Sequence, residues 1–151
     1  RSAPRAELSR FDAVGEATLA WAADYPAPPA AWAPLDAPVV PSPYATRETT
    51  HGPAFQLLRE LRRDARGASA RFDAAAGAVP VGALHPALLD GCTHIVPLSR
   101  LAQWWPDIGP EWNGLPRALC GLTLHGPTPT TGEVRVEVRP RGRAIEGGGP
   151  L

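Results

Sequence analysis

The chain has 151 residues, which is enough for one ordinary domain with a packed core. Fifteen basic and fifteen acidic residues cancel to a formal net charge of zero, so no overall field would attract nucleic acid or an anionic membrane. We therefore expect neither as a partner. No apolar run reaches the ~18 residues of a membrane span, and the first residues lack the apolar core of a signal peptide. These features predict a cytoplasmic protein.

Two residue counts add to this expectation. The chain contains no Met, which predicts that it is a segment of a longer protein. It has two cysteines, Cys92 and Cys120, too few for a disulfide framework and without the CxxC spacing of a metal site. We expect both to be free thiols in a reducing compartment.

The first third of the chain is irregular. Residues 12–21, DAVGEATLAW, alternate partly between apolar and polar side chains and predict a weak strand. Prolines at 26, 28, 29, 34, 38, 41 and 43 then remove backbone donors and favour extended backbone, so residues 25–50 are predicted to be a connection. The aromatic residues Tyr25, Trp32 and Tyr44 indicate that this connection lies along a protein surface.

The rest of the chain shows clearer periodicity. QLLRELRRDAR, residues 56–66, favours a helix by propensity alone, and residues 68–72 suggest a short strand. Pro86 is suited to a first helical turn and predicts a helix over 86–95 that Pro97 ends. Alternating runs at 117–126 and 133–141 predict a hairpin with the arginines and Glu137 on its wet face.

The predicted helix carries a candidate acid. Asp90 and His94 are four residues apart, so their side chains share one face and can hydrogen-bond. Their neighbours are largely apolar, and burial disfavours the charged form of a carboxyl group, which makes it useful as a general acid at neutral pH. The same spacing also fits an exposed pair worth a few tenths of a kcal/mol. Spacing leaves both interpretations open.

The other histidines carry weaker signals. His51 precedes Gly-Pro, which predicts a turn and makes it a candidate to line the same cleft. His85 precedes Pro86 and is explained by the start of a helix, while His125 lies in the predicted hairpin. Because no HxxH, HExxH or CxxC occurs, we expect no metal. The usual signatures of serine hydrolases, phosphate loops and dinucleotide sites are also absent from the sequence.

Three motifs in a fixed order carry a resemblance. HGPAFQ (51–56), HPALLDGCTH (85–94) and Leu115-Pro116 resemble the second half of the dehydratase domain of polyketide synthases, over roughly residues 50–139. The resemblance implies an α+β hotdog fold, in which a curved antiparallel sheet wraps around a central helix, as the second half of a double hotdog. It also predicts that residues 58–66 and 68–73 form a hairpin, in place of the helix that propensity favours.

The resemblance implies a division of the chain and a set of roles. Residues 1–24 would end a preceding hotdog, 25–50 would connect, 51–140 would form the C-terminal hotdog, and 141–151 would be a flexible tail. Asp90 would be the catalytic acid that protonates the departing hydroxyl, with His94 orienting it. Two positions depart from the family: His51 stands where Tyr is usual, and Arg117 replaces an aromatic residue. The implied substrate-binding residues are His51, Gly52, Pro53, Phe55, Gln56, His85, Pro86, Leu115 and Pro116.

The implied activity is the removal of water from a 3-hydroxyacyl chain, giving a 2,3-unsaturated thioester. The substrate would be carried on the phosphopantetheine of an acyl carrier protein, with no cofactor bound directly. In the family the base is a histidine of an HxxxGxxxxP motif, and no histidine here has it. The base is therefore expected from an N-terminal hotdog half, which would be a partner together with the carrier protein and other synthase domains.

Two other functions stay open. A product-template-like domain, which steers aromatic cyclisation, shares the double hotdog and an aspartate in a similar helix. A catalytically silent dehydratase-like domain could serve as a structural or docking element. Hotdog domains commonly associate edge to edge, so a homodimer is also expected by analogy of fold.

Overall fold

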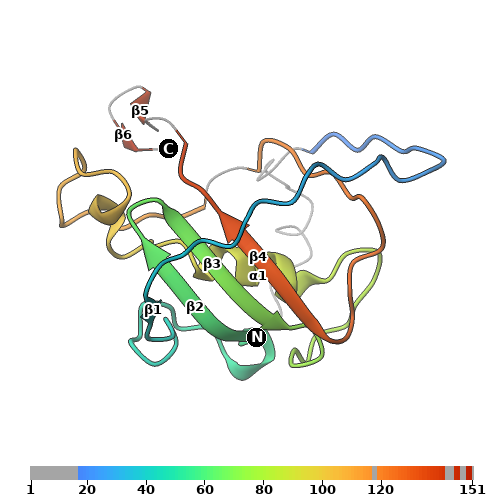
Figure 1. The fold of residues 1–151 in the computed structure, drawn as a ribbon, viewed down its shortest axis with the longest axis horizontal. Helices are drawn as coiled ribbons and strands as arrows, with labels where there is room; N and C mark the ends of the chain where they lie inside the picture. The colour runs from blue at the N-terminus through green and yellow to red at the C-terminus, as the bar shows by residue number, and fades with distance from the viewer. Residues whose placement is uncertain (1–16, 117–118, 142–144, 147–148, 151) are drawn as a thin grey trace, which may run out of the picture.

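The computed structural model describes residues 17–116, 119–141, 145–146 and 149–150. Its centre is an antiparallel four-stranded sheet in the order β1-β2-β3-β4, with one α-helix packed on one face (Figure 1). This arrangement is compatible with the expected hotdog-like α+β fold. No helix among these residues is long and apolar enough to cross a membrane. The elements are β1 (Val39–Val40), the 3₁₀ turn η2 (Pro53–Phe55), β2 (Leu58–Asp64), β3 (Gly67–Asp73), α1 (Pro86–His94), the 3₁₀ turn η3 (Leu101–Gln103), β4 (Glu133–Val138), β5 (Ile145–Glu146) and β6 (Gly149–Pro150).

The segment that propensity alone assigned to a helix forms the β2–β3 hairpin. Leu61 pairs with Ala70, and an irregularity in register between Leu58 and Glu60 keeps both Leu58 and Leu61 buried. Helix propensity is a weak preference that tertiary packing overrides. The helix prediction for residues 56–66 is therefore wrong, and the hairpin that the family resemblance implied is confirmed.

β3 and β4 form the surface on which α1 packs. Ala68, Ala70 and Phe72 pair with Val138, Val136 and Val134, and all six belong to the core or pack against it. Phe72 is fully buried, and a Cβ added at Gly91 of α1 would lie 2.8 Å from its ring. A glycine at this point lets the helix backbone approach the sheet closely. Asp90, the neighbouring residue, is thereby held at a fixed height above the sheet.

The hairpin predicted over residues 117–141 is wrong in the described part of its first strand, and residues 117–118 lie outside the described residues. Residues 119–125 form no strand, and Leu119 stays 74% exposed. β4 instead pairs with β3, because its three valines complete the surface under α1. The weak strand predicted at 12–21 is also not found in its described part, residues 17–21, where Trp21 is 90% exposed; the remainder lies outside the described residues.

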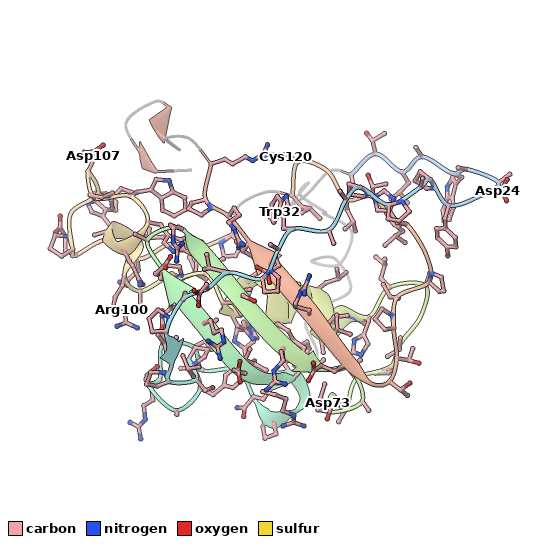
Figure 2. The ribbon with its side chains drawn as sticks, in the orientation of Figure 1. Asp24, Trp32, Asp73, Arg100, Asp107 and Cys120 are labelled. Carbon is pink, nitrogen blue, oxygen red and sulfur yellow. The ribbon has the colours of Figure 1, made fainter. Side chains whose placement is uncertain are left out.

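The proline-rich connection lies along the sheet face opposite α1, as Figure 1 shows for the chain leading into β1. Leu35 and Ala37 are buried there. Arg135 donates to the carbonyl of Trp32, whose ring lies 5.5 Å from the guanidinium of Arg139 (Figure 2). The expectation that this stretch follows a protein surface is confirmed.

The covering connection corrects one further prediction. Glu137 was expected on a wet face, but its side chain is only 9% exposed. It accepts a hydrogen bond from the hydroxyl of Ser69 at 2.6 Å and pairs with Arg139 at 3.0 Å.

The tail, residues 141–151, was predicted to be flexible. The short strands β5 and β6 pair with each other there. Residues 142–144, 147–148 and 151 lie outside the described part of the chain.

An enclosed ion pair anchors the end of the connection beside α1. Arg63 and Glu48 are paired at 3.0 Å, with side chains 2% and 5% exposed. Arg63 also donates to the carbonyl of Ile95, the residue that follows α1, and Arg100 pairs with the same oxygen of Glu48. Because the connection is held at this point, the hydroxyl of Tyr44 lies 2.9 Å from Nδ1 of His94 in the last turn of the helix.

Candidate active site

The start of α1 is fixed by His85. Its Nδ1 accepts a hydrogen bond from the backbone N–H of Leu88 at 3.2 Å, and its Nε2 donates to the carbonyl of Ala74 at 2.9 Å. The residue is 1% exposed, and Pro86 follows at the first helical position, where a missing N–H costs nothing. Both ring nitrogens of His85 are thus occupied by the cap. The structure gives this residue a structural task and leaves it no free nitrogen for the substrate contact that was expected.

Asp90 and His94 form a close pair on α1. Oδ2 of Asp90 lies 3.0 Å from Nε2 of His94, and their side chains are 33% and 1% exposed. The pair is therefore neither the exposed surface pair nor a fully buried one. The carboxyl group reaches solvent, and the imidazole lies enclosed behind it. Burial, reinforced by the nearby His51, lowers the pKa of His94 against the opposing effect of Asp90, so the neutral imidazole is favoured.

Tyr44 belongs to the same cluster, and sequence analysis did not identify it. Its hydroxyl lies 2.9 Å from Nδ1 of His94 and 3.3 Å from the carbonyl of Phe55. Burial raises the pKa of Tyr44 to about 12, so it remains a neutral phenol at physiological pH. Tyr44 and His94 are 50 residues apart in the chain, and no local motif links them. The only signal was an aromatic residue in a connection expected to touch the protein surface.

His51 completes the cluster from the other side. Its Nε2 lies 3.4 Å from Oδ2 of Asp90, and its ring centroid lies 4.0 Å from that of His94. The amide of Gln56 donates to the carbonyl of His51 at 2.7 Å, and the hydroxyl of Thr49 contacts Nδ1 of His51. The turn that begins at His51 thus lies beside the candidate acid. Gln56 braces this turn, and the half-buried Phe55 packs against the core.

The remaining candidates are spread more widely. Gly52, Pro53 and Pro86 are exposed at the starts of η2 and α1. Leu115 is 86% exposed and Pro116 is also exposed, in a segment without regular structure, and no contact joins either to the cluster among the described residues. The strand expected after them is missing from residues 119–125. These two residues are therefore not brought to the site.

Other candidates also lie outside the cluster. His125 bonds to the carbonyl of Pro26 through Nδ1. Cys92 donates to the carbonyl of Leu88, and burial raises the pKa of its thiol. Both cysteines are free, as expected.

The cluster defined by Tyr44, His51, Asp90 and His94, here called the α1 cluster, has clear chemical capacities. A carboxyl group that is one-third exposed can exchange a proton with a bound molecule, while an enclosed neutral imidazole holds it in position. Donor atoms of His51, Asp90 and His94 also all lie within 4.8 Å of one another, which is close enough to share an ion. The first capacity fits acid–base catalysis, and the second fits metal binding, which no local motif had indicated.

Comparison with known protein families identifies the chain. A family model described as "Polyketide synthase dehydratase N-terminal domain" matches residues 25–149. Searches of curated proteins and of solved structures returned no match. The matched range includes the whole four-stranded sheet, α1 and all members of the α1 cluster. The chain belongs to the polyketide synthase dehydratase family.

Proposed function

We propose that this chain is the acid-bearing C-terminal hotdog of a polyketide synthase dehydratase. It would act on a 3-hydroxyacyl chain carried on the phosphopantetheine of an acyl carrier protein and give a 2,3-unsaturated thioester. One observation carries the proposal: the partly exposed carboxyl group of Asp90 stands on the central helix with the enclosed imidazole of His94 3.0 Å from it. This is the geometry of a proton donor with a positioning group behind it.

The proposed reaction is a 2,3-elimination. A base removes the proton on C2, the C2–H electron pair forms the C2=C3 bond, and the C3–O bond breaks. Asp90 gives its proton to the leaving oxygen, which departs as water, and the carboxylate is later reprotonated. His94 acts as a positioning residue, since its enclosed ring limits how the carboxyl group can turn. Tyr44 holds that ring from the other nitrogen.

The base has to come from outside this chain. Its four histidines are His51, His85, His94 and His125, and none is followed by the GxxxxP spacing of the family's base. The described strands also suggest where another half would dock: β4 pairs with β3 on one side only, and no described strand lies along its other edge. An unpaired strand edge favours addition of further sheet. The description of the matched family model names the N-terminal domain, and assignment to the acid-bearing half rests on α1 and on these two features.

A silent domain is the second candidate. The absence of a base motif from the chain favours it, because acid and base must act on one substrate from opposite sides for an efficient elimination. The partly exposed Asp90 and its enclosed neighbour favour the enzyme, since a docking domain has no need of this pair. A cyclisation domain would use the same cluster on a longer substrate.

Mass spectrometry of the carrier-bound substrate tests these alternatives. A 3-hydroxyacyl thioester on its carrier protein is incubated with this chain and the hotdog segment that precedes it in the synthase. We expect loss of one water, abolished in Asp90→Asn. Loss of water that persists in this variant would remove Asp90 from the mechanism. No loss, with the domain folded and the carrier bound, would favour the silent or cyclising domain.

A further inference from the structure

Three side chains of the α1 cluster, those of His51, Asp90 and His94, place one donor atom each within 4.8 Å of the others. Oδ2 of Asp90 lies 3.0 Å from Nε2 of His94 and 3.4 Å from Nε2 of His51. We propose that His51, Asp90 and His94 bind one divalent transition-metal ion of the zinc class. The proposal is independent of whether the chain catalyses dehydration.

The spacing of the donors suits such an ion. Donors about 2.0–2.2 Å from one zinc ion lie about 3.3–3.6 Å from each other in tetrahedral coordination, and adjacent donors lie about 2.8–3.1 Å apart in octahedral coordination. The two distances to Asp90, 3.0 and 3.4 Å, are close to these separations, and the donors of all three residues lie within 4.8 Å. His51, whose side chain is 39% exposed, has room to turn and shorten the remaining separation.

The donor types select the class of ion. Two imidazoles and one carboxylate suit zinc, iron, cobalt or nickel, whereas magnesium and calcium prefer sites made of oxygen donors. Three protein ligands leave at least one coordination position open, as in catalytic and regulatory sites. The exposed side of Asp90 and His51 would carry that open position.

Two donor atoms lack other partners, which is the second observation. Oδ2 of Asp90 and Nε2 of His94 are enclosed, and neither makes a hydrogen bond within the described part of the chain. Their separation of 3.0 Å is a close contact without hydrogen-bond alignment. Enclosed polar atoms without a bond cost free energy, so such atoms often mark an ion or water site. A metal ion between the residues would satisfy both atoms.

The outer nitrogens of both histidines are already held. Nδ1 of His94 contacts the hydroxyl of Tyr44 at 2.9 Å, and Nδ1 of His51 contacts the hydroxyl of Thr49. Metal-binding histidines usually make such a bond through the second ring nitrogen, which orients the ring and fixes the tautomer. The tyrosine hydroxyl is also near the carbonyl of Phe55 and can donate to it while accepting from His94. Both rings therefore present Nε2 to Asp90.

Bound metal and proton donation exclude each other at this site. A carboxylate oxygen that coordinates an ion cannot carry the proton required by the proposed elimination. A metal ion would therefore inhibit any acid chemistry of Asp90, and this consequence alone rests on the proposed function. His51, at the position where the resembled family usually has Tyr, is the ligand that sets this chain apart, and Tyr44 and Thr49 contact the two histidine rings.

Calorimetric titration of the untagged chain with zinc chloride and with cobalt chloride tests the site. We expect one ion per chain, visible absorption bands for cobalt, and no displacement by excess magnesium. His51→Tyr should weaken binding at least about 10-fold, the size of effect that even an outer hydrogen-bond partner of a metal ligand can have. His125→Gln, at an exposed histidine outside the cluster, should bind as the parent chain does.

The outcomes separate the site from accidental binding. Absence of binding in the parent chain would overturn the proposal, as would equal affinity of the parent and His51→Tyr. Equal weakening by His125→Gln would place the ion elsewhere. His51 is partly exposed, so a thermal melt of His51→Tyr should match the parent chain without metal. Since binding is measured without substrate, and dehydration is measured in the presence of a chelator, either proposal can fail alone.

Discussion

The two faces of the sheet hold charged groups in different ways. On the face away from α1, Arg71 pairs with Glu60 and Glu133 through side chains that are 28–60% exposed. On the α1 side, Arg63 and Glu48 are 2% and 5% exposed, and His94 is 1% exposed. These two Arg71 pairs lie beyond the proline-rich connection that encloses Glu137 and stay largely in water, which screens them. The inner groups are desolvated, so their polar atoms are stabilised only by a few contacts within the protein.

The degree of enclosure decides how much a single substitution costs. An exposed pair loses little when one partner is removed, because water replaces the lost contact. An enclosed group left alone keeps the cost of its desolvation. Substitutions at Asp90, Glu48, Tyr44 and His94 probe this contrast.

The largest effect is expected at the proposed acid. Asp90→Asn should lower the rate of water loss about 10²–10⁴-fold, because the amide keeps the size of the side chain but has no proton to transfer. The measurement is the initial rate of the mass-spectrometric assay with the full dehydratase. Asp73→Asn is the matched control, since Asp73 pairs with Arg59 at the end of β3 with a side chain 40% exposed (Figure 2). Equal rates in the two variants would contradict the role of Asp90.

The next effect is on stability. Glu48→Gln should lower the free energy of unfolding by about 3–5 kcal/mol, because it leaves the Arg63 guanidinium charged and enclosed. Glu133→Gln removes a carboxylate that is 60% exposed and should cost less than about 1 kcal/mol. Urea unfolding of both variants measures the difference. Similar midpoints would show that enclosure does not separate the two pairs.

A smaller effect is expected at Tyr44. Tyr44→Phe removes the hydroxyl contact with His94 and should cost about 1 kcal/mol of stability. In the parent chain the folded pKa of Tyr44, about 12, lies above its ordinary value of 10.0. The resulting stabilisation is complete below pH 10 and is lost as pH rises toward 12. Phenolate absorbance should show this late transition in the parent chain and not in Tyr44→Phe.

The smallest effect concerns acid. The pKa of His94 is lowered from 6.5, so the unfolded chain binds this proton more readily than the folded one. Stability from the neutral ring is therefore present above pH 6.5 and falls as pH drops below it. Thermal melts at a series of pH values should show a shallower acid-side decline in His94→Gln than in the parent chain. Parallel declines would mean that His94 does not contribute.

Local features of the sequence were sufficient for the central helix. Pro86 and His85 mark its start, Pro97 follows its end, and the spacing of Asp90 and His94 puts them on one face. All of this depends on neighbours within one or two helical turns. The hairpin β2–β3 needed more than local information, since the propensity of residues 56–66 favours a helix and only the family resemblance predicted strands.

What the sequence determined by itself is thus the helix with its acid–histidine pair, because both follow from short-range spacing. Tertiary structure alone decided that β4 pairs with β3, that the proline-rich connection covers the outer face and Glu137, and that Tyr44 and His51 meet His94. These contacts join residues far apart in the chain, and their energy depends on burial. No window of sequence contains both the groups that meet and the surfaces that enclose them.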